Sequence, residues 1–600
     1  MGQKRGAGAL RTPAARVANG ATSKGTPPAQ ATTPPANSLA NERARLLVNA
    51  QHRLASLPAA ITELGHIFTQ AGHELALVGG PVRDAFLGLP IHDFDLTTSA
   101  RPQETEKLLS TWGNTWDIGR EFGTIGARRG DITVEVTTYR NDHYDIGSRK
   151  PAVDFGDTLE GDLTRRDFTV NAMAVRLPEL TLVDPCGGLD ALLRGELDTP
   201  VSAAQSFDDD PLRIMRAARF AAQLSLDVSE DVMRAMRDYA PRLEIVSAER
   251  IRAELERLII AEHPRRGIEL LVYTGVADVV LPEISNLRGA HDEHGRHKDV
   301  YEHSLQVLDN AIALEDAAAP PQSAGCKLAT SEPAASKPTT SEPAASAASG
   351  STAETNAAAP AAAGSASSTP AAAGSASSTS ASAGTERPIS ELNQAEIRAE
   401  IGTVARPDFV LRFAALMHDV GKPATRKFEA DGTVTFRFHD VVGARMTTRR
   451  MKQLRFDKQT IKDVSRLVEL HLRAYGFAEA DWTDSAVRRF VRDAGPLLSR
   501  LLRLIRADIT SQNKRRVRKL HAANNELERR IVELRRREEL DAVRPDLDGN
   551  EIMEILGIAP GRQVGKAYQY LLGLRLDEGA LGKEEAERRL RAWWEEQEQA

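Results

Sequence analysis

Residues 75–84 read LALVGGPVRD and decide the fold of the N-terminal part of the chain. The apolar run LALV predicts a short strand, the glycine pair predicts a tight turn, and PVRD begins a helix. Gly79 and Gly80 let the backbone approach a phosphate closely, and the helix N-terminus presents free N–H groups to an anion. Arg83 adds a fixed positive charge that suits a triphosphate. The stretch therefore predicts a strand–turn–helix unit that binds phosphate.

A pair of aspartates follows in HDFDL (92–96). Alternate side chains of a strand share a face, so Asp93 and Asp95 point the same way while Phe94 points into the core. Two carboxylates about 7 Å apart along a strand can bridge two divalent cations, which activate a hydroxyl and stabilise a leaving pyrophosphate. A site with only oxygen ligands suits Mg²⁺. Glu135, in ITVEVTTY, is either a third carboxylate near these metals or a surface strand residue.

Periodicity predicts the fold class. Between Glu74 and Asp184, helical stretches separate the β-like runs ELALV, FDLTT, FGTIGARR, ITVEVTTY and LTLVD. Residues 43–71 have the spacing of two helices, and after Asp208 apolar residues recur at intervals of three and four. The sequence therefore predicts an α+β fold, in which a head with a mixed β-sheet and helices precedes an all-α neck, body and C-terminal part.

Composition excludes few functions. The formal net charge of −6 does not favour a nucleic-acid partner, although a global average hides local patches. Cys186 and Cys326 cannot form a disulfide framework or a four-thiolate zinc site, and they fit free thiols in a reducing compartment. No apolar run is long enough for a membrane span, and residues 1–40 lack the apolar core of a signal peptide. We therefore expect a cytoplasmic location.

Two further motifs complete the pattern. DLTRRDFTVNAMAV (162–175) is rich in charged side chains, and DDDPLRIMRAARFAAQL (208–224) repeats an acidic residue and three arginines at every third position. With the glycine turn and the D-x-D pair, they resemble the motifs of class II nucleotidyltransferases, the family of tRNA CCA-adding enzymes and bacterial poly(A) polymerases. The resemblance covers roughly residues 60–290, with further likeness to about residue 520.

The resemblance implies nucleotide-binding roles. In the first motif, Arg165 and Arg166 would bind phosphate, and Asp167 and Asn171 would bond a ribose 2′-OH. In the second, Asp and Arg side chains offer acceptors and donors that resemble a base edge, so the protein itself would select C and A. The residues of this amino-acid template are Asp210, Arg213, Arg216 and Arg219. Asp209 stands where the family usually has Glu.

A second candidate metal site lies in the helical part. YEHSLQVL, LMHDVGK, RFHDVVG, VELHLR and RADIT together give an H…HD…D pattern, which resembles HD-type phosphohydrolase domains. Mixed nitrogen and oxygen ligands suit a transition metal such as Mn²⁺ or Ni²⁺, which can activate water for phosphoester cleavage. The predicted ligands are His303, His418, Asp419, His439, His471 and Asp508, and among them His439 and His471 would allow a second ion.

These patterns divide the chain. Residues 1–40 and 317–387 are rich in Ala, Pro, Thr, Ser and Gly, and such sequence buries too little apolar surface to offset ordering entropy. The expected domains are a disordered tail at 1–40, a nucleotidyltransferase head at 41–185, a helical neck that binds RNA and nucleotide at 186–288, an HD domain at 289–520 interrupted by a disordered insertion at 317–387, and a helical tail region at 521–600.

The resemblance implies template-independent addition of CCA, from CTP and ATP, to the 3′ end of tRNA, with a further HD phosphohydrolase activity. A poly(A) polymerase with the same chemistry is the nearest alternative. A third is an HD-type phosphohydrolase whose N-terminal domain only binds RNA, and the carboxylate pair argues against it. The expected partners are tRNA, CTP and ATP, without membrane or DNA, and the oligomeric state stays open.

Overall fold

The computed structural model describes residues 36–91, 93–119, 123–143, 152–290, 299–316, 387–431, 433–478, 482–511, 513–538 and 544–599. The predicted disordered insertion lies outside these ranges except for its last residue, and the predicted tail overlaps them only at residues 36–40. The described residues up to 316 and from 393 onward belong to one compact unit. Residues 387–392 belong to another and contain the 3-10 helix η4 (Ile389–Glu391).

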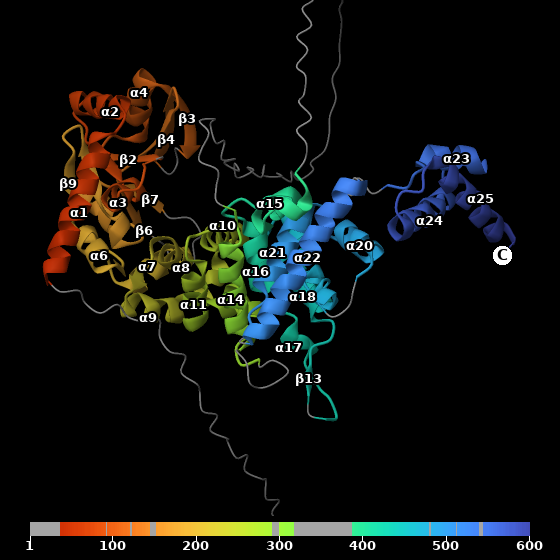
Figure 1. Cartoon of the computed structure of the whole chain (residues 1–600). Coiled ribbons are helices and arrows are strands. Elements are labelled where there is room, and N and C mark those ends of the chain that lie inside the picture. Colours follow the sequence, from red (N-terminus) through yellow and green to blue (C-terminus); the bar gives the residue numbers. More distant parts are fainter. Residues whose placement is uncertain are drawn as a thin grey trace, which may run out of the picture. The chain divides into compact units, whose positions relative to one another are not determined.

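The head is the red and orange part of the chain in Figure 1. Its seven-stranded mixed sheet has the strand order β3-β4-β5-β2-β1-β8-β9. Its strands are β1 (Leu75–Val78), β2 (Phe94–Thr98), β3 (Asn114–Gly119), β4 (Thr124–Arg129), β5 (Ile132–Thr138), β8 (Ala174–Leu177) and β9 (Thr181–Val183). β2 and β5 are parallel, and the other neighbouring pairs are antiparallel. The five predicted strands are confirmed, and β3 and β8, which were not predicted, complete the sheet.

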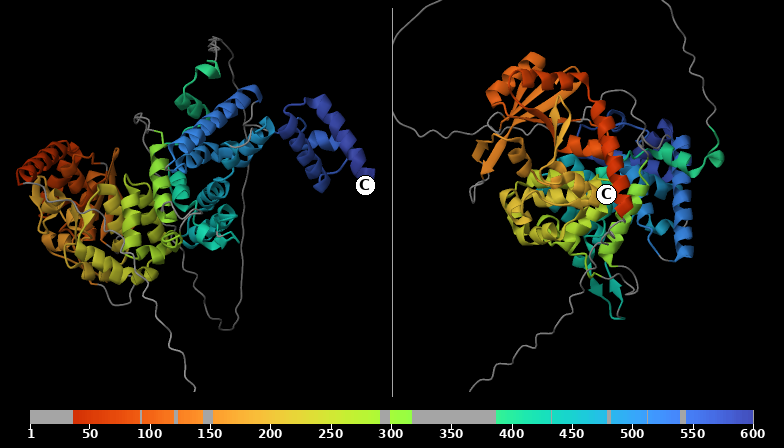
Figure 2. Two further views of the ribbon diagram at one scale, coloured as in Figure 1. Left: turned by 60° about the horizontal axis from the view of Figure 1, so that its bottom comes forward. Right: turned by 90° about the vertical axis from the view of Figure 1, so that its left-hand side faces the viewer.

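The two faces of the sheet differ. Along β5, Val134 and Val136 are buried, whereas Thr133 and Glu135 are exposed. Helices α2 (Ala59–Gln70) and α4 (Pro102–Trp112) pack on the buried face, and the right-hand view of Figure 2 shows the strands beneath them. One apolar face against helices and one open face is the usual arrangement of a layered α+β domain. Asp95 of β2 and Thr133 and Glu135 of β5 therefore remain accessible.

Helix α3 (Gly80–Leu87) starts directly after β1, as the glycine pair predicted. Helix α1 (Ala36–Ala55) packs along α3. Asn49 of α1 donates to the carbonyl of Phe86 at 3.1 Å, and Arg53 donates to the carbonyl of Gly88 at 3.0 Å. These bonds satisfy carbonyls at the C-terminal end of α3, which no residue of that helix could reach. The two helices predicted within 43–71 are confirmed as α1 and α2.

Smaller elements connect the head to a helical neck. The connecting elements are β6 (Arg140–His143), β7 (Ala152–Phe155), α5 (Leu159–Thr164), η2 (Thr169–Asn171), α6 (Gly188–Arg194) and β10 (Glu196–Leu197). The neck contains α7 (Ala203–Asp209), α8 (Leu212–Leu224), β11 (Asp227–Val228), α9 (Glu230–Tyr239), η3 (Ala240–Ile245), α10 (Ala248–Ile259), α11 (Pro264–Tyr273), α12 (Val276–Val280) and α13 (Pro282–Ser285). Helix α8 packs against both α10 and α11.

The described residues between 299 and 538 form helices and two short strands. These elements are α14 (Val300–Ala313), α15 (Gln394–Ile401), α16 (Phe409–Met417), α17 (Lys422–Thr425), β12 (Lys427–Phe428), β13 (Val434–Thr435), α18 (His439–Gln453), α19 (Lys458–Leu470), η5 (Tyr475–Ala478), α20 (Asp484–Ala494), η6 (Gly495–Leu497), α21 (Leu498–Ala507) and α22 (Lys514–Glu538). The predicted boundary at residue 520 falls inside α22, which packs on α15, α20 and α21.

Three helices follow with a core of their own. They are α23 (Gly549–Leu556), α24 (Arg562–Glu578) and α25 (Lys583–Gln599), and Ile552, Leu571 and Leu590 lie at their centre. Within the part of the chain that the structure describes, no helix is both long enough and apolar enough to cross a membrane.

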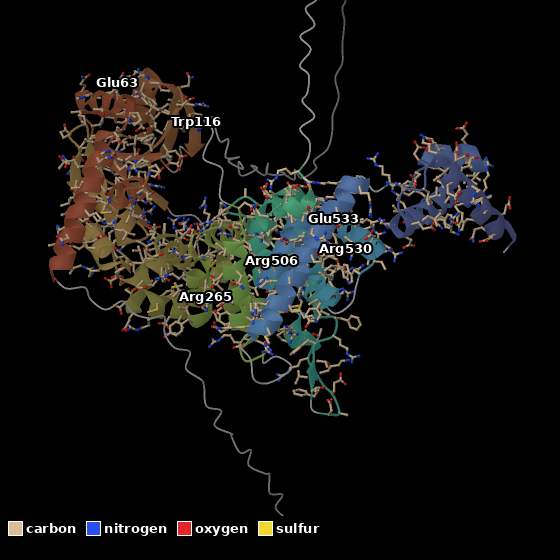
Figure 3. All side chains as sticks on the ribbon, viewed as in Figure 1. Glu63, Trp116, Arg265, Arg506, Arg530 and Glu533 are labelled. Carbon is tan, nitrogen blue, oxygen red and sulfur yellow. The ribbon has the colours of Figure 1, made fainter. Side chains whose placement is uncertain are left out.

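Polar contacts join the neck to the HD region. Arg265 of α11, labelled in Figure 3, donates to Glu302 at 2.9 Å and to Asp309 at 3.0 Å, both on α14. Deeper in the protein, Arg412 and Glu315 form a bidentate ion pair with two bonds of 2.7 Å, and their side chains are 1% and 0% exposed. Arg412 also donates to the carbonyl of Ala261 in the neck at 2.7 Å. The buried pair thus holds three segments together.

We predict that Glu315→Ala destabilises the protein by about 3–5 kcal/mol, because it leaves the charge of Arg412 buried without its partner. Urea denaturation measures this effect. The double variant Glu315→Leu with Arg412→Met should recover much of the loss, since it buries no charge. Arg234→Ala, which removes an exposed pair with Asp231, is the control and should change stability by less than about 0.5 kcal/mol. Equal effects of Glu315→Ala and the control would contradict the role of the buried pair.

Candidate active site and metal centre

Three carboxylates gather on the open face of the head sheet. In the parallel pairing of β2 with β5, Asp95 lies directly opposite Glu135, and Asp93 stands one residue before β2. Neighbouring strands are about 4.8 Å apart, so the two paired carboxylates are close. Glu135 therefore lies beside Asp95 while remaining exposed on its strand, and its role as a third metal ligand stays a prediction.

Charge repulsion marks this cluster. Burial raises the pKa of Asp95, Arg166 opposes that shift, and Asp93 adds to it. Burial also raises the pKa of Glu135, with further contributions from Asp95 and then Asp93. Asp95 and Glu135 thus feel the negative charge of neighbouring carboxylates, and a divalent cation would relieve that repulsion. Three oxygen-donor side chains without a nitrogen or sulfur ligand fit Mg²⁺.

A cavity of about 230 Å³ opens beside these carboxylates. Its lining residues are Val78, Asp95, Leu96, Glu135, Thr137, Arg140, Arg165 and Arg166. Two carboxylates therefore face a space that also holds three guanidinium groups. Cations held by the carboxylates and arginines on the other side are what a triphosphate requires for charge neutralisation.

The glycine turn lies against the same arginines. Gly79 has φ of +76°, and a Cβ atom there would stand 3.3 Å from Nη1 of Arg166. Only glycine combines that backbone conformation with so close an approach. Arg83 of α3 donates from Nη1 to Oδ1 of Asn171 at 2.7 Å. The structure thus brings together the glycine turn, Arg83, Arg166 and Asn171, which sequence reasoning took from separate motifs.

Asp162 is a residue that sequence reasoning missed. Its side chain is fully buried, and it accepts from Nε of Arg165 at 3.0 Å and from Nη2 of Arg166 at 3.1 Å. Burial raises the pKa of Asp162, but Arg166 and Arg165 outweigh burial and hold the pKa below its usual value. One carboxylate thereby positions two cavity arginines. The spacing of three and four residues in DLTRR contained the signal for it.

Asp167 joins the head to the neck. It accepts from Nε of Arg216 at 2.8 Å and from Nδ2 of Asn171 at 3.2 Å. Burial raises the pKa of Asp167, but Arg216 more than compensates and the pKa is lowered. The two predicted ribose-binding residues are therefore bonded to each other, and through Arg216 to helix α8.

The other predicted template residues contact different partners. Asp210 accepts from Arg250 at 3.0 Å, and Arg213 donates to Ser206 at 2.8 Å and to the carbonyl of Arg165 at 2.7 Å. Helix α10, which supplies Arg250, was not expected to take part. The bond to Arg165 places Arg213 next to a residue that lines the cavity.

Glu254 of α10 is the second buried carboxylate that the sequence did not reveal. It lies 2.6 Å from Nε of Arg219 and 3.8 Å from Nη1 of Arg216. The guanidinium of Arg219 stands 4.1 Å from the centroid of the Phe220 ring. Burial lowers the pKa of Arg219 to about 10, against the influence of Glu254, so the side chain keeps its charge at neutral pH. No local spacing links α10 to α8, which is why the sequence gave no signal.

The predicted HD ligands converge in the helical region. Nε2 of His303 lies 3.2 Å from Nε2 of His418, 3.0 Å from Asp508 and 3.3 Å from Asp419. Nε2 of His439 lies 3.3 Å from the other oxygen of Asp419. Two groups are close enough to hold an ion, namely His303, His418 and Asp419, and Asp419, His439 and His471. Asp419 belongs to both groups and can bridge two ions.

The histidine rings are oriented for metal binding. Nδ1 lies 2.8 Å from a backbone carbonyl in His418 and in His439, and 2.6 Å from one in His471. Nδ1 must carry the hydrogen in these bonds, so each Nε2 presents a lone pair. The buried Nε2 of His471 has no hydrogen-bond partner among the described residues. Such an orphaned nitrogen, aimed at a carboxylate and other imidazoles, fits a metal ligand.

The pKa shifts of the predicted ligands differ in direction. Burial would lower the pKa of His303, but Asp419 and Asp508 outweigh burial and raise it to about 9. Burial lowers the pKa of His471 to about 4, and the nearby His418 adds to that shift. The pKa of Asp508 is also below its usual value, because His303 and His418 outweigh the effect of burial. His471 is therefore neutral and Asp508 ionised at neutral pH, which are the forms that bind metal.

Comparison with known families agrees with this geometry. Residues 75–198 match the family model described as the poly A polymerase head domain. Residues 225–287 match the model described as the probable RNA and SrmB-binding site of polymerase A, and residues 395–531 match the HD domain. The predicted resemblance and the predicted α+β fold are confirmed.

CCA-adding enzymes are among the similar proteins. That of Streptococcus sanguinis is 40% identical over 240 residues, which are 39% of this chain and 59% of the relative. That of Streptococcus mutans is 40% identical over 230 residues, which are 38% of this chain and 56% of the relative. The matched part of the chain thus spans less than two thirds of the length of these relatives.

Solved structures share the fold. The CCA-adding enzyme of Bacillus stearothermophilus in complex with CTP has a TM-score of 0.54 at 21% identity, covering 90% of this chain and 98% of that one. The Thermotoga maritima CCA-adding enzyme complexed with tRNA has a TM-score of 0.50 at 15% identity, covering 91% and 98%. At such identities the likeness establishes the arrangement of the elements.

We predict that the HD centre binds two ions, and that His471→Ala reduces the bound metal from two ions per chain to one. Asp419→Ala should remove both, because its two oxygens serve both groups. Mass spectrometry of the metal content, after loading with Mn²⁺ and gel filtration, measures the stoichiometry, with Asp93→Ala and Asp95→Ala present in every variant so that the head contributes no ion. His52→Ala, at an exposed position in α1, is the control and should still bind two ions. An unchanged content in folded Asp419→Ala would contradict the assignment.

Proposed function

We propose that this chain adds CCA to the 3′ end of tRNA, taking CMP and AMP from CTP and ATP. The observation that carries the proposal is the cavity in which Asp95 and Glu135 face Arg165 and Arg166 beside the Gly79 turn. A pair of Mg²⁺ ions held by Asp93 and Asp95 would activate the RNA hydroxyl and neutralise the triphosphate. The RNA oxygen bonds to the α-phosphorus, and the bond to pyrophosphate breaks.

The chain's own residues position the nucleotide in this proposal. Arg83, Arg165 and Arg166 bind the triphosphate, with the free N–H groups of α3 at Gly80. Asp167 and Asn171 bond the ribose hydroxyls, for which Asn171 retains donor and acceptor capacity. Partial burial lowers the solvation of these carboxylates, and their neighbours add negative charge. Both effects make them bind cations more strongly than a single carboxylate in water.

The template residues would read the base. Asp210 and Arg213 are held by Arg250, Ser206 and the Arg165 carbonyl, so reading a base requires that they exchange these partners. Arg216 and Arg219 are anchored by Asp167 and Glu254 and would keep α8 in place during that exchange. A protein template needs no nucleic-acid template, and it can present new donors when the terminal base changes.

A poly(A) polymerase remains the second candidate, because the match to the poly A polymerase head domain fits either reaction. CCA addition is favoured because the similar proteins are named CCA-adding enzymes.

We also propose that the HD centre hydrolyses phosphate esters, with Mn²⁺ or Ni²⁺ as candidate metals that would activate water there. A phosphate or 2′,3′-cyclic phosphate on an RNA end suits this role, since its removal frees the hydroxyl that the head needs. A tRNA substrate favours a cytoplasmic location.

The test uses tRNA that lacks its 3′ CCA, with CTP, ATP or both. We expect two added nucleotides with CTP, three with both and almost none with ATP alone. Asp95→Ala should lower the rate by at least about a thousandfold, because a metal ligand is lost. Asp131→Ala, an exposed aspartate of the head, is the control and should act as the wild type does. A long ladder with ATP alone would indicate the poly(A) polymerase instead.

A second prediction concerns nucleotide choice. Arg213→Ala should reduce the preference for CTP over UTP by about ten- to a hundredfold, since an unpaired buried donor or acceptor costs roughly 1–3 kcal/mol. Single-turnover incorporation of each nucleotide measures the preference. Arg213 also holds the Arg165 carbonyl, and a purely structural role would slow all nucleotides equally. An unchanged preference would therefore rule out base reading by Arg213.

A further inference from the structure

The N-terminal half of α22 carries a dense positive charge that the fold leaves unpaired. Residues 514–525 contain five cations, Lys514, Arg515, Arg516, Arg518 and Lys519, and no carboxylate. All five side chains are exposed, and among the described residues none has a carboxylate partner. The positive end of the helix dipole lies at this terminus, so the cations stand where they weaken the helix. Folding alone does not account for them.

The other half of the same helix has the opposite design. Arg530, labelled in Figure 3, pairs with Asp484 at 2.7 Å, and Arg537 pairs with the same carboxylate at 2.7 Å. Arg529 pairs with Glu526 at 2.6 Å. The arginines of this half therefore serve helix packing, whereas the first half presents its charge to solvent.

The unpaired half lies close to the HD centre. Oγ1 of Thr510 is 2.9 Å from Nδ1 of His303, and Lys514 follows only four residues later. Four residues span at most about 14 Å, so the start of α22 is near the metal ligands. On the other side, Nη2 of Arg516 donates at 2.8 Å to the hydroxyl of Tyr475, four residues after His471. Tyr475 is 56% exposed.

An exposed aromatic ring also adjoins the centre. Phe438 directly precedes the predicted ligand His439, and at 74% it is the most exposed large apolar side chain among the described residues. Its φ of +64° is left-handed, which is unfavourable for a bulky side chain. A strained backbone and an apolar ring exposed to water both lower the stability of the fold. We therefore infer that Phe438 serves binding rather than folding. Aromatic rings next to cationic tracts bind single-stranded nucleic acid by stacking on its bases.

We propose that the HD centre takes the 3′ end of a single-stranded RNA, with the terminal base on Phe438 and the backbone along the cationic half of α22. This rests on the proposed phosphohydrolase and specifies its substrate class as a polynucleotide. The exposed cations of α22 can neutralise backbone phosphates, and Tyr475 offers a second stacking surface between these cations and the HD centre. A free mononucleotide would reach only Phe438 and the metal ligands.

The charge test compares two triple variants of the full chain. Arg515→Ala, Arg518→Ala and Lys519→Ala together remove three unpaired cations, and Arg529→Ala, Arg536→Ala and Arg537→Ala remove three paired ones as the matched control. The substrates are a short RNA ending in a 2′,3′-cyclic phosphate and cytidine 2′,3′-cyclic phosphate. We expect the ratio of kcat/KM for RNA to that for the mononucleotide to fall at least about tenfold in the first variant only. The salt slope of RNA turnover should drop by about 2, since each single-strand phosphate contact contributes about 0.7.

A photoreactive base at the 3′ end of the RNA tests binding without activity. Crosslinks within 436–445 and 514–519 are expected in the wild type. Their absence would overturn the proposal, as would an unchanged RNA-to-mononucleotide ratio in the first triple variant. If the wild type hydrolyses neither substrate, the phosphohydrolase fails, and the crosslinks still decide where the RNA end lies.

Phe438→Asn separates binding from folding. Asn adopts left-handed backbone more readily than Phe, so the melting temperature should stay equal or rise. RNA turnover and the crosslink at 436–445 should fall about tenfold, and Phe438→Trp should retain both. Unchanged turnover and crosslinking in Phe438→Asn would show that Phe438 does not take part in RNA binding.

Discussion

The parallel pairing of β2 with β5 is the constraint on which the head depends. It sets Asp95 directly opposite Glu135 on the open face and leaves the apolar alternates of both strands under α2 and α4. A shift by one residue would turn the carboxylates into the core, because strand side chains alternate. The glycine turn after β1, the next strand in the sheet, then brings Arg166 and the start of α3 to the same face.

Buried carboxylates hold the cationic part of the site in place. Asp162 holds Arg165 and Arg166, Asp167 holds Arg216, and Glu254 holds Arg219. Each of these carboxylates lies among guanidinium groups that would otherwise repel one another. Since breaking a buried ion pair leaves an uncompensated charge, these carboxylates fix the guanidinium groups without a bound nucleotide. In the HD centre, the buried carboxylate of Asp419 likewise contacts several side chains at once, namely His303, His418 and His439.

Much of the fold was predictable from the sequence, because the strands of the sheet centre are apolar runs bounded by turns. β3 and β8 were missed since NTWDIG and AVRL are mixed in polarity. The D-x-D pair and the HD residues stand out by local motifs, and their binding of metal stays a prediction. The position of Glu135 beside Asp95 could not be predicted before the register of β5 was known. Glu254 lies on a helix that no local spacing links to the template arginines of α8. Such contacts depend on tertiary pairing rather than periodicity.

The most direct test of the central claim is a crystal structure of the full chain with Mn²⁺ and a non-hydrolysable CTP analogue, using anomalous scattering to locate the metal. We expect manganese bound by Asp93 and Asp95 beside Glu135, with the triphosphate between the Gly79 turn and Arg166. Manganese confined to the HD centre, or a triphosphate bound away from that turn, would contradict it.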